Sequence, residues 1–204
     1  SGFYPAEILV SDIRDSYELF KGRTNFAEYF GDISSDRLFK QPALAATLQR
    51  IAENGPDEFY KGQTATLIVA QMASSGGLIT LQDLAAYEAV WREPLRSPWR
   101  DYEVLSAPPP SSGGFAVVQL LKMKDYLDHH FAGVAHNSPQ YIHLVAEMEK
   151  RVFADRAEYM GDPDFVDIDM PALLADDYIA RRALEVQPDA ISRLDAVSPG
   201  NESP

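Results

Sequence analysis

The chain has 204 residues, of which 46% are hydrophobic, so it is long enough and apolar enough to bury a core. Its 31 acidic and 18 basic side chains give a formal charge of −13, which argues against nucleic acid as a partner because no local cluster of Lys and Arg offsets it. The absence of cysteine excludes disulfides and thiol catalysis, and no apolar run reaches the ~18 residues that a membrane span needs.

The first half of the chain contains a series of helix patterns separated by glycine and proline. Apolar residues recur close to every 3.6 positions in residues 6–20, which predicts an amphipathic helix. Pro42 stands near the start of the next pattern and Gly55 at its end, positions that these residue types favour. Thr80 and Asp83 resemble a capping box, with Asp in place of the usual Glu or Gln. We therefore predict helices over residues 6–20, 39–54, 56–74 and 80–87, and an aromatic-containing loop over residues 22–31.

The stretch from Tyr102 to Phe115 predicts a strand, a sharp turn and a helix. Three consecutive prolines over residues 108–110 lack the amide protons that a strand ladder needs, so the strand ends there. The turn contains neither Gly-x-Ser-x-Gly nor a glycine pattern that binds phosphate, which argues against a nucleophilic serine and against a phosphate site. We interpret it as a structural turn near the core, formed by Ser111, Ser112, Gly113 and Gly114.

The second half contains the longest predicted helix. Ser138 and Pro139 are a typical N-cap and first helical residue, and helical spacing continues to Tyr159. Glu147 and Arg151 are predicted to lie off the apolar stripe of this helix, on a charged face. A turn over residues 171–174 and a short helix over residues 176–182 follow, and we predict that residues 1–190 are ordered and residues 191–204 form a flexible tail.

Histidines are the main candidate metal ligands in a chain without cysteine. The candidate set is His129, His130, His136, His143 and Glu147. No His-Glu-x-x-His pattern occurs and two of the histidines fall in a polar loop, so solvated side chains are the favoured interpretation. The acidic run over residues 155–169 lacks the glycine and the glutamate that an EF-hand loop requires. We predict no metal site and no cofactor.

Five stretches carry information beyond local structure, through their sequences and their order. They are Phe-Lys-Gln-Pro-Ala-Leu-Ala-Ala-Thr-Leu at residues 39–48, Glu-Asn-Gly-Pro-Asp-Glu-Phe-Tyr-Lys-Gly at 53–62, Gly-Gly-Leu-Ile-Thr-Leu-Gln-Asp-Leu at 76–84, Ser-Ala-Pro-Pro-Pro-Ser-Ser-Gly-Gly at 106–114, and Phe-Ala-Asp-Arg-Ala-Glu-Tyr-Met-Gly-Asp-Pro-Asp-Phe at 153–165. Together they resemble the γ-glutamyltransferase (γ-glutamyltranspeptidase, glutathione hydrolase) family, and the resemblance covers essentially the whole chain.

The resemblance implies an N-terminal-nucleophile hydrolase of the α/β (α+β) class, made as one precursor that cuts itself into two subunits folded as an αββα sandwich. Residues 1–204 resemble a single segment, the C-terminal part of the large subunit, which is expected to be mostly helical with a few strands. In the family, a threonine freed at the N-terminus of the small subunit attacks the γ-glutamyl carbonyl, and water or an amino acid or peptide then accepts the acyl group. The implied partners are the small subunit and a γ-glutamyl substrate, and the implied location is periplasmic or secreted.

The sequence departs from the family pattern at the residues that perform the chemistry. The chain ends at Glu202-Ser203-Pro204, whereas family precursors continue within a few residues to Thr-Thr-His, so the nucleophilic threonine is expected just after Pro204. Arg92 matches a structural stretch and not the arginine that binds the substrate carboxylate in the family. No catalytic or substrate-binding residue therefore maps onto this chain, and the fragment alone is expected to be inactive. A cephalosporin (glutaryl) acylase of the same architecture and a non-catalytic scaffold, or pseudoenzyme, remain as alternatives.

Overall fold

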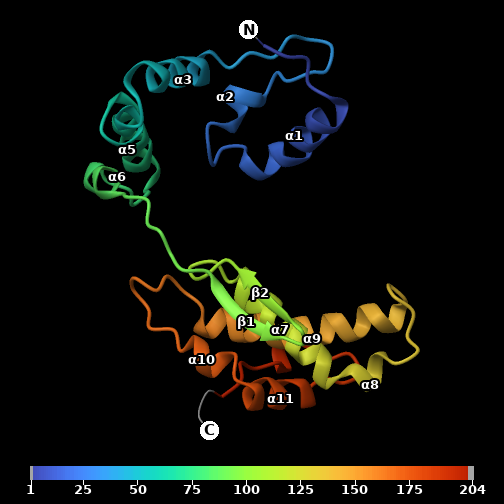
Figure 1. The fold of residues 1–204 in the computed structure, drawn as a ribbon. Coiled ribbons are helices and arrows are strands. Elements are labelled where there is room, and N and C mark those ends of the chain that lie inside the picture. Colours follow the sequence, from blue (N-terminus) through green and yellow to red (C-terminus); the bar gives the residue numbers. More distant parts are fainter. Residues whose placement is uncertain (1, 202–204) are drawn as a thin grey trace. The chain divides into compact units, whose positions relative to one another are not determined.

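The computed structural model describes residues 2–201, so residues 202–204 of the predicted tail lie outside the described residues (Figure 1). The chain divides into two compact units, unit 1 at Ser1–Ala89 and unit 2 at Val90–Pro204. Within the described range, no helix combines the length and the apolar character needed to cross a bilayer. The prediction that residues 1–204 are a single segment of a larger subunit concerns a longer chain and stays a prediction.

Unit 1 consists of short helices joined by turns. The helices are α1 Glu7–Phe20, α2 Phe26–Phe30, α3 Pro42–Asn54, α4 Asp57–Tyr60, α5 Gln63–Ser75 and α6 Leu81–Ala86. Gly76 ends α5 in the left-handed region, with φ at 73°, which favours glycine because it has no Cβ. The predicted capping box is present at α6: Asp83 N–H donates to Thr80 Oγ1 at 3.2 Å, and Thr80 N–H donates to Asp83 Oδ2 at 2.8 Å.

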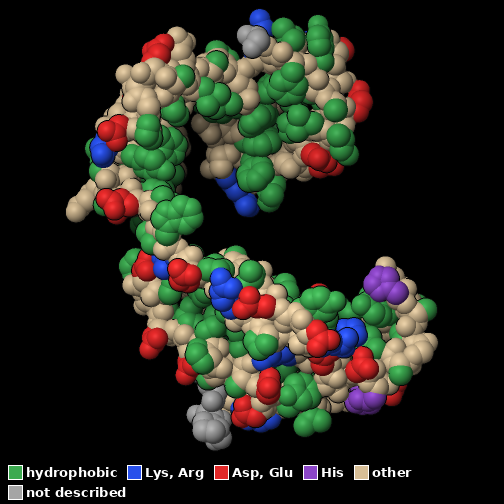
Figure 2. Space-filling model, in the orientation of Figure 1, with side chains coloured by type: hydrophobic (Ala, Val, Ile, Leu, Met, Phe, Trp, Pro, Cys, Tyr) green, Lys and Arg blue, Asp and Glu red, His purple; other side chains and the backbone are tan. Residues whose placement is uncertain are grey.

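Unit 1 has a small apolar interior, and part of its packing is polar. Glu58, nearly buried on α4, accepts hydrogen bonds from Arg50 Nε at 2.9 Å and from the backbone N–H of Thr64 at 3.1 Å, which joins α3 to α5. The Arg50 guanidinium lowers the pKa of the Glu58 carboxyl. Figure 2 shows many apolar side chains on the surface of this unit. The buried apolar residues of the described part of unit 1 are Pro5, Val10, Ile33 and Ala65.

Unit 2 combines a β-hairpin with helices. Its elements are β1 Leu95–Trp99, β2 Tyr102–Ser106, α7 Gly113–Tyr126, α8 Asp128–Phe131, α9 Pro139–Tyr159, α10 Met170–Leu173, α11 Asp176–Leu184 and the 3-10 helix η1 Leu194–Ala196. The two strands are antiparallel, with Leu95 opposite Ser106 and Trp99 opposite Tyr102. Helix α7 contacts both strands, α9 and α11, so it lies at the centre of the unit (Figure 1).

A continuous apolar core fills unit 2. Phe115 and Met123 on α7 are fully buried, as are Leu144 on α9 and Ile179 on α11. The core therefore joins three helices that lie far apart in the sequence, and non-directional burial of apolar area is sufficient to hold them together. The complete buried cluster is Phe115, Met123, Leu127, Phe131, Leu144, Met148, Val152, Leu173, Tyr178, Ile179, Ala183 and Val186.

The predicted fold class, a mostly helical segment with a few strands, is confirmed. The main corrections concern short helices. The predicted loop over residues 22–31 contains α2, and the single helix predicted over residues 56–74 is two helices, α4 and α5, separated at Lys61 and Gly62. The cause at Gly62 is steric: a Cβ there would lie 2.8 Å from the backbone oxygen of Glu58, so this position needs glycine, the ordinary residue with the lowest helix propensity.

Candidate functional site

The strand–turn–helix corner connects β2 to α7, as the sequence indicates. Gly114 is buried where the first turn of α7 meets β2, and a Cβ on it would lie 2.4 Å from the carbonyl oxygen of Ala107. The hydroxyl of Ser111 accepts a hydrogen bond from Gly113 N–H at 3.3 Å. Ser112 Oγ accepts one from Arg156 Nε on α9 at 2.7 Å. These contacts are those of a packed corner, and the interpretation of Ser111, Ser112, Gly113 and Gly114 as a purely structural turn stays a prediction.

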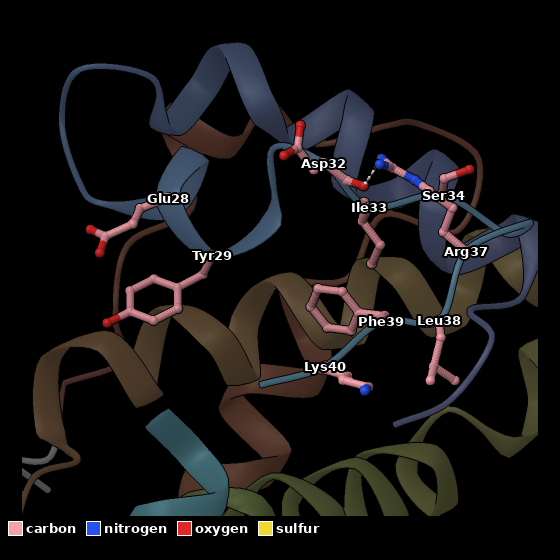
Figure 3. A pocket seen from close by; sticks show the side chains of 9 residues that line it. All are labelled: Glu28, Tyr29, Asp32, Ile33, Ser34, Arg37, Leu38, Phe39 and Lys40. Carbon is pink, nitrogen blue, oxygen red and sulfur yellow. Dashed lines mark hydrogen bonds between the residues drawn. The ribbon is translucent and has the colours of Figure 1, made fainter. Parts of the chain in front are cut away.

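A pocket of about 310 Å³ lies within unit 1. Figure 3 shows its lining of mixed character: Ile33 and Phe39 are apolar, and Arg37 donates to the carbonyl oxygen of Asp32 at 2.6 Å. Ser34 also lines it, but its hydroxyl bonds to Asp36 and not to a general base such as histidine. The lining residues therefore include no serine paired with a histidine base.

The structure does not bring the candidate metal ligands together. His129 and His130 lie on the short helix α8 and not in the predicted polar loop, with their ring centroids 3.9 Å apart. His136 lies against the ring of Tyr141. His143 Nε2 is 2.9 Å from the carbonyl oxygen of Gln187. Among residues 2–201 no group of three or more His, Asp or Glu side chains is arranged to hold a metal ion.

The most strongly constrained polar groups in unit 2 are two buried ion pairs. The first lies on α9, where Glu147 Oε2 accepts from Arg151 Nη1 at 2.6 Å and Glu147 Oε1 accepts from Lys150 Nζ at 2.6 Å. Only 1% of Glu147 is exposed. Burial raises the pKa of this carboxyl, but hydrogen bonds from Lys150, Ser192 and Arg151 outweigh burial and lower the pKa to about 2. Glu147 is therefore ionised at neutral pH.

The second ion pair joins α9 to α11. Asp155 Oδ2 accepts a hydrogen bond from Arg182 Nε at 3.1 Å, and Asp155 Oδ1 lies 2.9 Å from Arg182 Nη2 in the same ion pair. Asp155 is fully buried, and a planar guanidinium that binds both carboxylate oxygens gives this contact a defined geometry. Tyr178 packs beside the pair, and burial together with the Asp155 charge raises the pKa of its hydroxyl, which stays neutral.

Both ion pairs hold residues 192–200, which we call the C-terminal strap. At its start, Ser192 N–H donates to Glu147 Oε1 at 3.0 Å, and Ser192 carbonyl accepts from Lys150 Nζ at 2.7 Å. The hydroxyl of Ser192 accepts from Arg151 Nη2 at 2.8 Å. Both the N–H and the carbonyl of Ser192 thereby fix the strap to α9.

The end of the strap is held by the second pair. Gly200 N–H donates to Asp155 Oδ1 at 2.8 Å, and the Gly200 carbonyl accepts from the Tyr159 hydroxyl. Two residues earlier, the Ser198 carbonyl accepts from Arg182 Nη2 at 3.1 Å. The described part of the predicted flexible tail thus contacts α9 at the start of the strap and both α9 and α11 at its end, and its mobility stays a prediction.

Glu147 and Arg151 are buried, so the prediction that they lie on a charged, solvated face is wrong. The available signal was their spacing, since Glu147, Arg151 and Asp155 recur every four residues and so share one face of α9. That face adjoins the apolar stripe of the same helix, so it turns toward α11 and the strap. Periodicity alone cannot show that a charged row has partners elsewhere in the chain.

Comparison with known proteins places the chain in a defined family. The family model described as Gamma-glutamyltranspeptidase matches residues 1–202. The chain belongs to the gamma-glutamyltranspeptidase family, which confirms the resemblance seen in the sequence.

Individual relatives agree with the family assignment. The glutathione hydrolase proenzyme of Pseudomonas aeruginosa is 52% identical over 98% of this chain, and the Acylase ACY 1 proenzyme of Pseudomonas sp. (strain SE83) is 36% identical over 80% of it. The gamma-glutamyltranspeptidase of Pseudomonas nitroreducens, solved with L-DON, has a TM-score of 0.87 and 52% identity over 98% of this chain and 60% of its own. The chain spans 36% of the length of the first relative and 29% of the second.

Proposed function

We propose that this chain is the C-terminal part of the large subunit of a γ-glutamyltransferase (glutathione hydrolase) precursor. The observation that supports it is the family match over residues 1–202, together with the proenzyme names of the relatives. In this proposal the precursor cuts itself, and the threonine expected just after Pro204 becomes the N-terminus of the small subunit. The class is therefore an autoprocessed acyltransferase and hydrolase, made as a zymogen and located in the periplasm or secreted.

The proposed reaction is transfer of a γ-glutamyl group through a covalent enzyme intermediate. The threonine hydroxyl attacks the γ-glutamyl carbonyl of glutathione or a related compound, its own α-amine acts as base, and the amine of the substrate leaves. Water, an amino acid or a peptide then accepts the acyl group. In this proposal the present chain supplies no catalytic residue, and its role is to pack against the small subunit and to shape the corner and core that support the site.

The test is maturation and turnover of the full-length protein. We expect N-terminal sequencing of the companion chain to give a threonine, and the matured protein to release the chromophore from a γ-glutamyl anilide. A precursor in which that threonine is replaced by alanine is the matched control, and it should show neither cleavage nor turnover. A full-length protein that stays uncut and inactive would overturn the proposal and favour the non-catalytic scaffold.

A second candidate is a cephalosporin acylase, because one relative is an acylase proenzyme. Its lower identity, 36% against 52%, favours the γ-glutamyl substrate for this chain. A comparison of glutathione turnover with glutaryl-cephalosporin turnover in the matured protein distinguishes the two candidates. A preference for the glutaryl-cephalosporin would replace the γ-glutamyl proposal.

A further inference from the structure

The contacts that hold the C-terminal strap bind its backbone. Of the strap groups that α9 and α11 contact, only the Ser192 hydroxyl belongs to a side chain, and the others are N–H and carbonyl groups of Ser192, Ser198 and Gly200. Backbone contacts fix where a segment lies and depend little on its sequence. An intact buried ion pair contributes little more to stability than a well-packed apolar pair of the same volume would, although removing one partner alone is costly. The arrangement of the two ion pairs here fits a positioning role better.

Gly200 fits its place so closely that no other residue type can occupy it without a shift. A Cβ on Gly200 would lie 2.5 Å from the Tyr178 hydroxyl oxygen and 2.7 Å from Arg182 Cδ. Both of these side chains are themselves buried, so neither can swing away into solvent. The site at the end of the strap therefore accepts a bare backbone and holds it from three directions, through Asp155, Tyr159 and the Tyr178–Arg182 wall.

We propose that this anchor is a positioning site for self-cleavage of the precursor, with Asp155 and Arg182 as positioning residues. The inference rests on the proposed function, which puts the bond that is cut just after Pro204. Each residue of extended chain spans at most about 3.6 Å, and only a few residues separate Gly200 from that bond, so fixing Gly200 limits how far the bond can move. With Gly200 held, the chain has less conformational entropy to lose when the bond reaches its reactive geometry. The anchor thereby lowers the entropic part of the barrier to cleavage.

The step that the anchor serves is an acyl shift followed by hydrolysis. The threonine hydroxyl oxygen adds to the carbonyl carbon of the preceding residue, the C–N bond breaks, and the proton lost by the hydroxyl goes to the leaving nitrogen. The products are an ester and a free α-amine. Water then cleaves the ester, which leaves a carboxylate on the large subunit and restores the threonine hydroxyl.

The experiment measures the rate of self-cleavage of the full-length precursor, with Gly200→Ala as the main variant and Ser198→Ala as the matched control. Ser198 lies on the same strap, its side chain is exposed, and only its carbonyl is bound. We expect Gly200→Ala to slow cleavage by about 10-fold to 100-fold, the range typical of a small misplacement of reacting groups. Ser198→Ala should cleave at the wild-type rate.

Two further measurements separate positioning from a general loss of structure. Tyr159→Phe removes the hydroxyl that donates to the Gly200 carbonyl and adds no atoms, so it tests the same anchor if Gly200→Ala does not fold. We expect cleavage to slow by a few-fold, consistent with loss of a single hydrogen bond. In molecules of either variant that do mature, kcat and KM for a γ-glutamyl anilide should equal the wild-type values, because the anchor acts during self-cleavage, before the mature enzyme forms.

The outcomes distinguish this inference from the proposed function. A wild-type precursor that never cuts itself overturns both. A wild-type precursor that matures, while Gly200→Ala and Tyr159→Phe mature at the wild-type rate, overturns the positioning role alone. Matured variants with reduced kcat would assign these residues a general structural role and would also overturn it.

Discussion

Unit 2 and unit 1 differ in how much of their apolar surface they bury by themselves. Unit 2 has a continuous cluster in which side chains of α7, α9 and α11 exclude water completely. In the described part of unit 1, four apolar side chains are buried, while Leu44, Leu48 and Leu67 on its helices are about half exposed. Each buried leucine contributes roughly 2 kcal/mol relative to an exposed one. The buried cluster of unit 2 therefore stabilises this unit through contacts among its own residues.

Unit 1 shows that helical spacing of apolar residues does not by itself lead to burial. Such residues are buried only where another surface packs against them. Exposed apolar groups of this kind mark surfaces that bind other parts of a protein. The chain spans 36% of a relative, so the longer protein proposed above contains additional surface for this purpose. The following variants test the comparison.

The largest expected effect is loss of the ion pair between α9 and α11. Arg182→Met leaves the fully buried Asp155 without its partner, which should lower the free energy of unfolding by about 3–5 kcal/mol. Arg181→Met is the matched control, because Arg181 makes an exposed ion pair with Asp177 and should contribute less than about 1 kcal/mol. Urea denaturation of the full-length protein provides the measurement. Equal effects of the two variants would contradict a self-contained unit 2.

The second test compares one leucine from each unit. Leu144 is 0% exposed and Leu48 is 57% exposed. In the 204-residue chain, Leu144→Ala should lower the free energy of unfolding by about 2–5 kcal/mol, and Leu48→Ala by no more than about 0.5 kcal/mol. A cost for Leu48→Ala that rises in the full-length protein would show that another part of it covers α3. A large cost already in the short chain would refute the weak core assigned to unit 1.

The third test uses the pKa of Glu147, which is lowered in the folded state to about 2 from 4.5. Since the folded pKa is depressed, this group stabilises the protein fully above about pH 4.5, and the contribution is lost as the pH falls toward about 2. The shift corresponds to about 3 kcal/mol at neutral pH. Glu147→Gln should therefore lower the free energy of unfolding at neutral pH and narrow its difference from wild type at acid pH. Denaturation curves at several pH values check this, and a constant difference would be inconsistent with it.

The sequence predicted most of the fold because helix starts and stops depend on local chemistry. Pro42, Gly55 and the Thr80 capping box act within a few residues of themselves, so their signals are readable without a structure. The buried ion pairs were missed because their meaning depends on residues about 30 to 45 positions away. A row of charges along α9 has the same pattern whether it faces water or the strap. Only tertiary contacts decide between the two.

The smallest expected effect is at the N-terminus of α6 in unit 1. Thr80→Ala removes the hydroxyl that accepts from Asp83 N–H, and a lost N-cap costs about 1 kcal/mol. Thr66→Ala, at an exposed position in α5, is the control and should be neutral or slightly stabilising because alanine has the higher helix propensity. Hydrogen exchange of the α6 amides in the full-length protein measures the effect locally. Because unit 1 has little core of its own, loss of the cap should speed exchange across α6 alone; a uniform increase over unit 1 would mean that this helix is coupled to the rest through contacts beyond its cap.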